Sequence, residues 1–271
     1  MNTRQILDHF YRTCAWVDPQ TTVDRVIFGD AEKPVRTVLT TWISSMAACR
    51  EAARRGVDLL ITHEPTFWSH GNERVNPDDS TALAKAQVLE EAGLTVLRLH
   101  DSWDLFPEIG MPFAWAQFLG IPTPPVAISA NRYQHRYDIA PLPAGEFAQQ
   151  AAEKTAQLNE PVLQFAGDPE RIISRIGLNT GCACDTWEYE RLGCDLFIVC
   201  DDGSSYWHSI RHAVDGHYPV LRANHGTSEE PGMATLTGYL QTTFPELQVE
   251  HLPYAGSYVP VGQVPVNTIR P

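Results

Sequence analysis

Apolar, strand-like runs alternate with segments of helical periodicity along most of this 271-residue chain. In the first half, a helix is expected over 4–16, and then strands over 36–42, 58–62 and 95–99 alternate with helices over 45–55 and 81–92. In the second half, strands are expected over 134–140, 161–166, 172–179, 195–200, 219–223 and 247–252, with helices over 144–157, 185–192, 205–213 and 231–241. Mostly apolar strands indicate sheets that helices cover on both faces, so we expect an α/β fold.

The segment Gly120-Ile-Pro-Thr-Pro-Pro125 is the best internal boundary. Three prolines in so few residues cannot continue a helix or a central strand. The strand and helix alternation resumes after it. We therefore expect two α/β halves that meet near this segment.

Composition and charge exclude two classes of protein. Lys and Arg number 20 against 33 Asp and Glu, and the formal net charge is −13. Without a basic run, a nucleic-acid-binding surface is not expected. No stretch approaches the roughly 20 apolar residues of a membrane span, and the N-terminus lacks the apolar core of a signal peptide. We expect a cytoplasmic protein that binds neither nucleic acid nor membrane.

The six cysteines are scattered, without the spacing of a zinc knuckle. Free thiols are the expected state in a chain of this kind. Cys182 and Cys184 would face the same side of a strand, so chelation of a soft metal by this pair is an open alternative.

Three of the expected strands end in a histidine and a carboxylate. These pairs are His63 and Glu64, His100 and Asp104, and His225 and Glu229. Ligand sites in α/β folds gather where strands end, and imidazole with carboxylate is a donor set for divalent metals. The pattern predicts a metal site with two metals. Each pair alone could also be a surface turn or a hydrogen-bonded polar group of the core.

The first pair is not the start of a helical HExxH zinc motif. Residue 67 is Phe, where that motif requires histidine, and Pro65 would disrupt a helix interior. What remains is a strand-end pair followed by a loop.

Longer motifs resemble the Nif-three-like dinuclear metal-centre family, whose members are also called GTP cyclohydrolase I type 2-like proteins. They are Leu60-Ile-Thr-His-Glu-Pro65, His100-Asp-Ser-Trp-Asp104 followed by Pro107-Glu-Ile-Gly110, and Asn224-His-Gly-Thr-Ser-Glu-Glu-Pro-Gly232. Phe28-Gly-Asp30, Ile176-Gly-Leu-Asn-Thr-Gly181 and Gly193-Cys-Asp-Leu-Phe-Ile-Val-Cys-Asp-Asp202 resemble further family segments. The likeness runs nearly the whole length, in the family's order.

The resemblance implies the Nif-three-like fold, with two similar α/β halves and the metal site in the cleft between them. The implied domains are 1–125 plus 224–271, and 126–223, because ligands near both ends of the chain must meet. The implied metal ligands are His63, Glu64, Asp104, His225 and Glu229. Alignment on Pro107-Glu-Ile-Gly110 selects Asp104 rather than Asp101, and His100 would handle protons or support the ligands.

This chain departs from the family at three positions: Glu64 stands in place of a second histidine, Thr41-Trp42 in place of a Leu-Asp pair, and Asn224 in place of a glycine. With Glu64 the five implied ligands carry three negative charges instead of two. A harder donor set favours Mn²⁺, Fe²⁺ or Mg²⁺, although carboxylates bind Zn²⁺ as well.

The resemblance implies two divalent ions per chain and a metal-dependent hydrolase. Its substrate would be a small molecule, either a purine-like heterocycle or a phosphoester, attacked by a metal-activated water. It also implies a homohexamer built as a trimer of dimers. The alternatives are a non-catalytic hexameric metal-binding assembly or interaction protein and a metal-free structural descendant.

Overall fold

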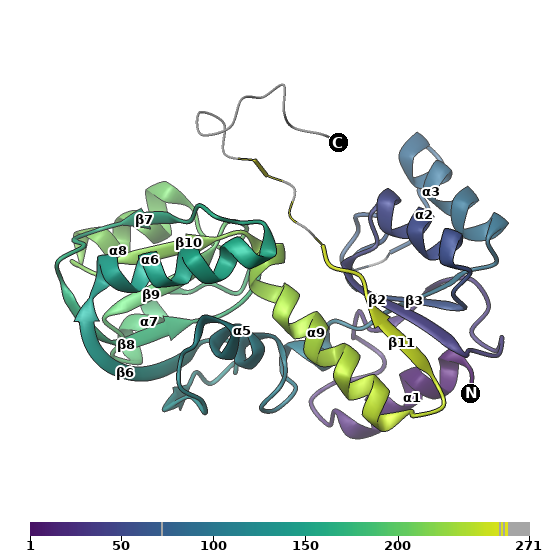
Figure 1. Cartoon of the computed structure of the whole chain (residues 1–271), viewed down its shortest axis with the longest axis horizontal. Helices are drawn as coiled ribbons and strands as arrows, with labels where there is room; N and C mark the ends of the chain where they lie inside the picture. The colour runs from purple at the N-terminus through teal and green to yellow at the C-terminus, as the bar shows by residue number, and fades with distance from the viewer. Residues whose placement is uncertain (72, 255, 257, 260–271) are drawn as a thin grey trace. The chain divides into compact units, whose positions relative to one another are not determined.

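The computed structural model describes residues 1–71, 73–254, 256, 258 and 259. The chain divides into two compact units. Unit 1 comprises Met1–Ala114 and Glu230–Tyr254, and unit 2 comprises Trp115–Glu229 with the described residues that follow Tyr254. The sequence expectation placed the corresponding boundaries after residues 125 and 223. Figure 1 shows the helices and strands of both units.

Unit 1 contains a five-stranded sheet in the order β1-β4-β3-β2-β11. Its strands are β1 (Arg25–Phe28), β2 (Thr37–Ile43), β3 (Leu59–Glu64), β4 (Thr95–Arg98) and β11 (Gln248–His251). All neighbours are parallel except β1, which pairs antiparallel with β4. Because β11 lies beside β2, the chain after Glu229 returns to the first unit.

Helices cover both faces of this sheet (Figure 1). One face packs on α1 (Thr3–Thr13) and α9 (His225–Thr243), the other on α2 (Met46–Arg55) and α3 (Ser80–Glu91). Along β3, Leu59 and Ile61 enter the first core and Leu60 enters the second. This alternation is the period of two expected of a strand buried on both faces.

Unit 2 contains a six-stranded sheet in the order β5-β6-β8-β9-β10-β7. Its strands are β5 (Ala127–Ile128), β6 (His135–Pro143), β7 (Gln164–Ala166), β8 (Ile172–Leu178), β9 (Leu196–Cys200) and β10 (Val220–Ala223). The three central strands β8, β9 and β10 are parallel, and the outer pairs are antiparallel.

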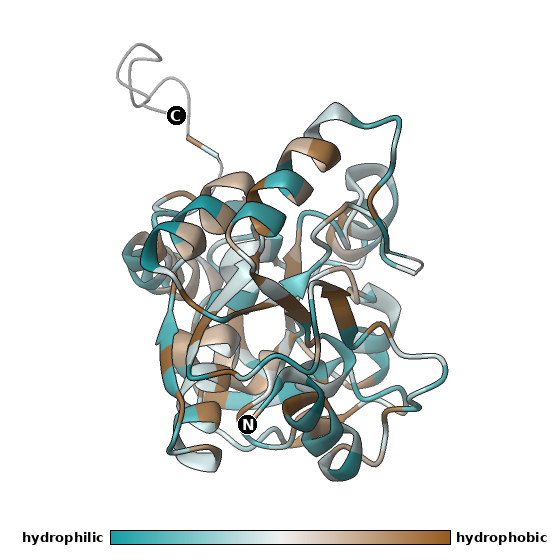
Figure 2. Ribbon diagram, turned by 90° about the vertical axis from the view of Figure 1, so that its right-hand side faces the viewer, coloured by the Kyte–Doolittle hydropathy of each residue, from teal (hydrophilic) through white to brown (hydrophobic). Residues whose placement is uncertain are grey.

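This second sheet is also covered on both faces. α5 (Met111–Leu119) and α6 (Ala144–Thr155) pack on one face, and α6 leads into the short η1 (Ala156–Leu158). α7 (Thr186–Arg191) packs on the other face with the π-helical turn η2 (Tyr206–Ile210) and α8 (Arg211–Asp215). In Figure 2 brown segments occur in several strands, and the helices carry both brown and teal residues. Two similar α/β halves are therefore confirmed.

Local signals mark the ends of the first two helices of unit 1. The Asn2 side chain accepts a hydrogen bond from Gln5 N at 2.9 Å and so caps α1, and Gly56 ends α2 with φ +64°. Some elements differ from the expectation. α9 begins at His225 rather than residue 231, with Pro231 inside it. β1, the helical turn α4 (Asp101–Asp104) and α5 were not predicted.

Among the described helices, none combines the length and the apolarity needed to cross a membrane.

Candidate metal centre

The first group of site residues lies where β3 and β4 end in unit 1. His63 and Glu64 are the last residues of β3, and His100 precedes α4, which ends at Asp104. The parallel pairing of β3 with β4 brings these ends together. We call His63, Glu64, His100 and Asp104 the β3–α4 cluster.

His63 is held in one orientation by the backbone. Its Nδ1 lies 3.1 Å from Leu99 O, a carbonyl that can only accept, so Nδ1 carries the hydrogen. Nε2 then faces Asp104, with 3.4 Å to Oδ1. The side chain is fully buried and stacks on His100 at 4.3 Å between ring centroids. This is how metal-binding histidines are usually oriented, with one nitrogen fixed and the other directed at the site.

His100 is surrounded by carboxylates. Its Nδ1 lies 3.1 Å from Asp101 Oδ1 and 3.2 Å from Asp104 Oδ2, and its Nε2 lies 3.8 Å from Glu64 Oε1. Burial acts to lower the pKa of His100, but these carboxylates outweigh burial and raise it to about 9. Burial likewise acts to raise the pKa of Asp104, yet His100 and His63 leave it lowered. The cluster is therefore a site that favours positive charge.

Asp101 and Asp104 both approach His100 Nδ1, but their other contacts differ. Asp101 Oδ2 accepts from Thr22 Oγ1 at 2.7 Å and from Val23 N at 3.2 Å. Asp104 faces both imidazoles of the cluster and is buried. Asp104 is thus the carboxylate within reach of a cation held by His63.

Asp24, which precedes β1, fixes the start of α4. Its carboxylate accepts from the backbone N–H groups of His100, Asp101 and Ser102 and from the Ser102 hydroxyl. An anion at the N-terminus of a helical turn satisfies donors that would otherwise lack a partner. Burial raises the pKa of Asp24 against these hydrogen bonds. Asp24 therefore positions His100 and the turn that carries Asp104 through hydrogen bonds to the backbone and to Ser102.

The second group lies at the start of α9 in unit 2. His225 and Glu229 are one helical turn apart, and Nε2 lies 3.0 Å from Glu229 Oε2. His225 Nδ1 donates to Asp202 Oδ2 at 2.8 Å, so this imidazole too has one nitrogen fixed and the other facing a buried carboxylate. We call His225, Glu229 and Asp202 the α9 cluster.

Gly181, in the loop after β8, packs against His225 and Glu229 of this cluster. A Cβ at this position would lie 2.5 Å from Glu229 Oε1 and 2.8 Å from His225 Nε2. The backbone here has φ +60°, which favours glycine. Only a residue without a side chain leaves these two ligand-type atoms accessible.

Asp201 and Glu160 hold the backbone that leads into α9. Asp201 Oδ1 accepts from His225 N at 2.8 Å, and its Oδ2 accepts from Asn224 Nδ2 at 2.9 Å. Glu160 accepts from Asn224 N at 2.9 Å, and burial raises the pKa of this carboxyl. Asn224 thus contributes to the helix start.

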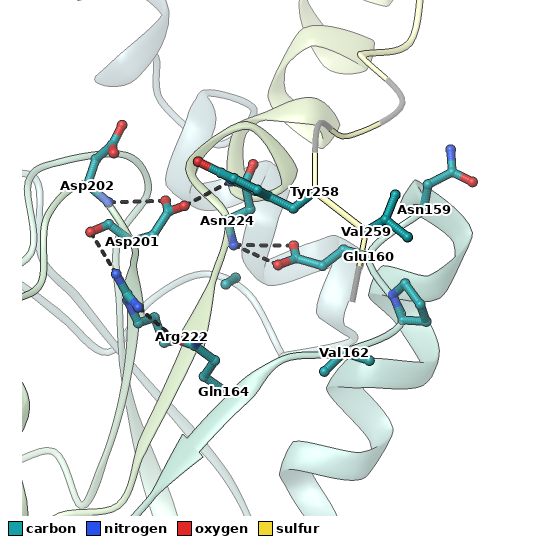
Figure 3. Close-up of a pocket in the computed structure, with 12 residues that line it drawn as sticks. Asn159, Glu160, Val162, Gln164, Asp201, Asp202, Arg222, Asn224, Tyr258 and Val259 are labelled. Atoms are coloured by element: carbon teal, nitrogen blue, oxygen red, sulfur yellow. Dashed lines mark hydrogen bonds between the residues drawn. The ribbon is translucent and has the colours of Figure 1, made fainter. Parts of the chain in front are cut away.

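A pocket of about 520 Å³ lies in unit 2 beside these residues (Figure 3). Amides, carboxylates, one arginine and a few apolar side chains line it, among them Glu160, Asp202, Arg222 and Tyr258. Its volume is within the range of small-molecule sites. Asp202 lines the pocket and also bonds His225, so the pocket adjoins the α9 cluster.

Of the five predicted ligands, the structure groups His63 with Asp104 and His100, and Glu64 with His100 and His70. In each of these groups, the candidate ligand atoms lie within 4.8 Å of one another. His225 and Glu229 form the pair in unit 2.

The family's sequence model, described as Duf34/NIF3 (NGG1p interacting factor 3), matches residues 1–257. The chain belongs to this family.

Two curated relatives are named "GTP cyclohydrolase 1 type 2 homolog". The Deinococcus radiodurans protein is 22% identical over 88% of this chain and 87% of its own length. The Vibrio cholerae protein is 25% identical over 76% of this chain and 80% of its own length. A Staphylococcus aureus hypothetical protein superposes with a TM-score of 0.80 at 16% identity, over 96% of this chain and 99% of that chain. A Bacillus cereus protein related to NIF3 has a TM-score of 0.75 at 11% identity, over 93% of this chain and 96% of that chain. At such identities the structural likeness shows the fold.

Sequence reasoning missed Asp24, His70 and Arg98. Arg98 lies in the buried strand β4, fully enclosed, and its Nε donates to His63 O at 2.9 Å. An arginine within an apolar strand was a usable signal, because a buried guanidinium requires several acceptors. Asp24 and His70 lie in polar segments where the sequence gives no comparable signal.

Proposed function

We propose that this NIF3-family protein binds divalent metal ions through His63, Glu64, Asp104, His225 and Glu229 and uses them to hydrolyse a small molecule. One observation carries the proposal. In both clusters, Nδ1 of the histidine is fixed by an acceptor while Nε2 faces a buried carboxylate, at 3.4 Å for Asp104 and 3.0 Å for Glu229. A histidine that serves only as a buried polar group does not need a fixed Nδ1 together with an Nε2 directed at a buried carboxylate. Both His63 and His225 have this geometry.

The donor set fits a divalent ion. Two imidazoles and three carboxylates suit Mn²⁺, Fe²⁺ and Zn²⁺, and the extra negative charge of Glu64 favours the harder ions. Gly181 keeps space beside His225 Nε2 and Glu229 Oε1, which a Cβ would take. We propose two ions per chain.

The residues around the proposed ligands also suit hydrolysis. A bound divalent ion supplies Lewis acidity for such a reaction. His100 is placed to hold a proton between Asp104 and Asp101, and to give it to a leaving group. The pocket beside Asp202 has room for a small molecule, with carboxylates and amides to orient it. A heterocyclic C=N bond or a phosphoester is the proposed substrate bond.

Metal analysis of the purified full chain tests the ligand assignment. Wild type should hold two ions per chain, and Glu64→Gln should hold about one because it loses one ligand charge. Glu64→His should restore two, with preference moved toward Zn²⁺. Asp104→Asn and Glu229→Gln each remove a proposed ligand carboxylate, so each should also lower the metal content.

Asp101→Asn is the matched control for Asp104→Asn. It makes the same chemical change three residues away, at a side chain that bonds Thr22 and Val23. Its metal content should equal that of wild type. Full occupancy in Glu64→Gln, or metal loss in Asp101→Asn but not in Asp104→Asn, would show that the assignment is wrong.

Catalysis is tested separately from binding. The metal-loaded protein should turn over small purine-like heterocycles or phosphoesters, and a chelator should abolish the turnover. Metal binding without turnover on either class would favour the non-catalytic assembly role.

A further inference from the structure

The loop between β3 and α3 is fixed by buried charged side chains. Lys85 Nζ donates to Thr66 O at 2.7 Å, and Glu73 Oε1 accepts from Phe67 N at 2.7 Å. Arg98 Nη1 donates to His70 O at 3.0 Å. Lys85 and Arg98 are at most 2% exposed. Burying two cations costs free energy. We therefore infer that the fixed conformation of this loop has a functional role.

The loop presents His70 beside the β3–α4 cluster. Its ring packs edge-on against His100, with 4.9 Å between the centroids. Candidate ligand atoms of His70, Glu64 and His100 lie within 4.8 Å of one another. His70 is exposed, whereas Glu64 and His100 are partly buried. His70 is therefore the member of this group most accessible to a molecule that arrives from solvent.

Arg98 decides which nitrogen of His70 carries the hydrogen. Arg98 Nη2 lies 3.0 Å from His70 Nδ1. A guanidinium can only donate, so Nδ1 must accept, and the neutral imidazole carries its hydrogen on Nε2. With Nδ1 engaged and Nε2 protonated, neither nitrogen offers a lone pair to a metal. The hydrogen-bond geometry thus excludes His70 as a metal ligand, although its distance from Glu64 and His100 would permit it.

We propose that His70 is a substrate-binding residue whose Nε2–H donates to a negatively polarised oxygen of the substrate, with Arg98 as its positioning residue. The ligand class is a phosphoryl or carbonyl oxygen at the β3–α4 cluster. A donor fixed before the ligand arrives needs no reorganisation, which is the arrangement that stabilises developing negative charge. The identity of the ligand rests on the proposed function, whereas the tautomer does not.

Nitrogen-15 NMR of the histidine side chains tests the tautomer in the full chain. The His70 signals, assigned by their loss in His70→Gln, should show a protonated Nε2 and an unprotonated Nδ1. A hydrogen on Nδ1 would overturn the proposal. The tautomer can be measured even if wild type binds no metal. A wrong tautomer and a wrong proposed function can therefore be told apart.

Binding of inorganic phosphate to the metal-loaded protein tests the role. His70→Phe keeps a ring but no donor and should weaken phosphate binding about tenfold, while His70→Gln, which retains an N–H donor, should recover most of it. Both variants should keep the metal content of wild type. His208→Gln, at an exposed histidine of unit 2, is the matched control and should change neither quantity. Metal loss in His70→Gln, or unchanged phosphate affinity in His70→Phe, would refute the assignment.

Discussion

Replacing Gly181 with alanine should strain the backbone and also weaken metal binding at the α9 cluster. Its φ of +60° is unfavourable for alanine by about 1 kcal/mol. Its Cβ would also lie 2.5 Å from Glu229 Oε1, where ordinary contact begins at 3.4 Å. The carboxylate must therefore retreat by about 0.9 Å, several times the tolerance of about 0.2 Å in metal–ligand distances. We expect metal affinity to fall by about 10- to 100-fold.

Gly56→Ala is the matched control. Gly56 has nearly the same backbone, with φ +64°, but nothing lies within 4 Å of the added Cβ. Both variants should lose about 1 kcal/mol of unfolding free energy, or about 2 to 4 °C in Tm. Only Gly181→Ala should lose metal when titrated with Mn²⁺ or Zn²⁺ under calorimetric detection. Equal metal affinity in the two variants would refute the reasoning that Gly181 keeps the cluster open.

Three further predictions concern other parts of the molecule. Asp24→Ala should cost about 2 to 3 kcal/mol in urea unfolding, since it leaves buried donors at the start of α4 without their acceptor, and an unchanged midpoint would contradict this role. Burial lowers the pKa of His135 from 6.5 to about 4, so the unfolded chain binds more protons between these values and stability should fall by about 3 kcal/mol as pH drops from 6.5 to 4. His135→Gln should lack this contribution, and equal acid sensitivity in both proteins would disprove it. Light scattering should give the mass of a homohexamer, and a monomer at micromolar concentration would exclude the assembly that we expect from the family.

The sequence determined most of the secondary structure because the relevant signals are local. A short run of consecutive apolar residues such as Leu59, Leu60 and Ile61, with Gly56 before it, favours a strand that is buried on both faces. Glycine at position 56 ends a helix for an equally local reason. The short elements at 25–28, 101–104 and 111–119 were not expected, since four to nine residues carry too little periodicity to decide between strand, helix and loop.

The candidate ligands were also visible in the sequence, as pairs of histidine and carboxylate at strand ends. The orientation of their side chains could not be predicted from the sequence. His63 points its Nε2 at Asp104 because Leu99 O, 36 residues away, holds its other nitrogen. His225 depends in the same way on Asp202.

The tertiary structure alone decided which residues support the site. Asp24 binds the backbone of α4 across 76 to 78 positions of sequence, and Arg98 reaches His70 across 28. Such contacts depend on the order in which strands pair, since β1 lies beside β4 and β4 beside β3. A carboxylate or a guanidinium has the same local propensities wherever it lies, so only the folded neighbours determine whether it caps a helical turn, fixes a tautomer or faces solvent.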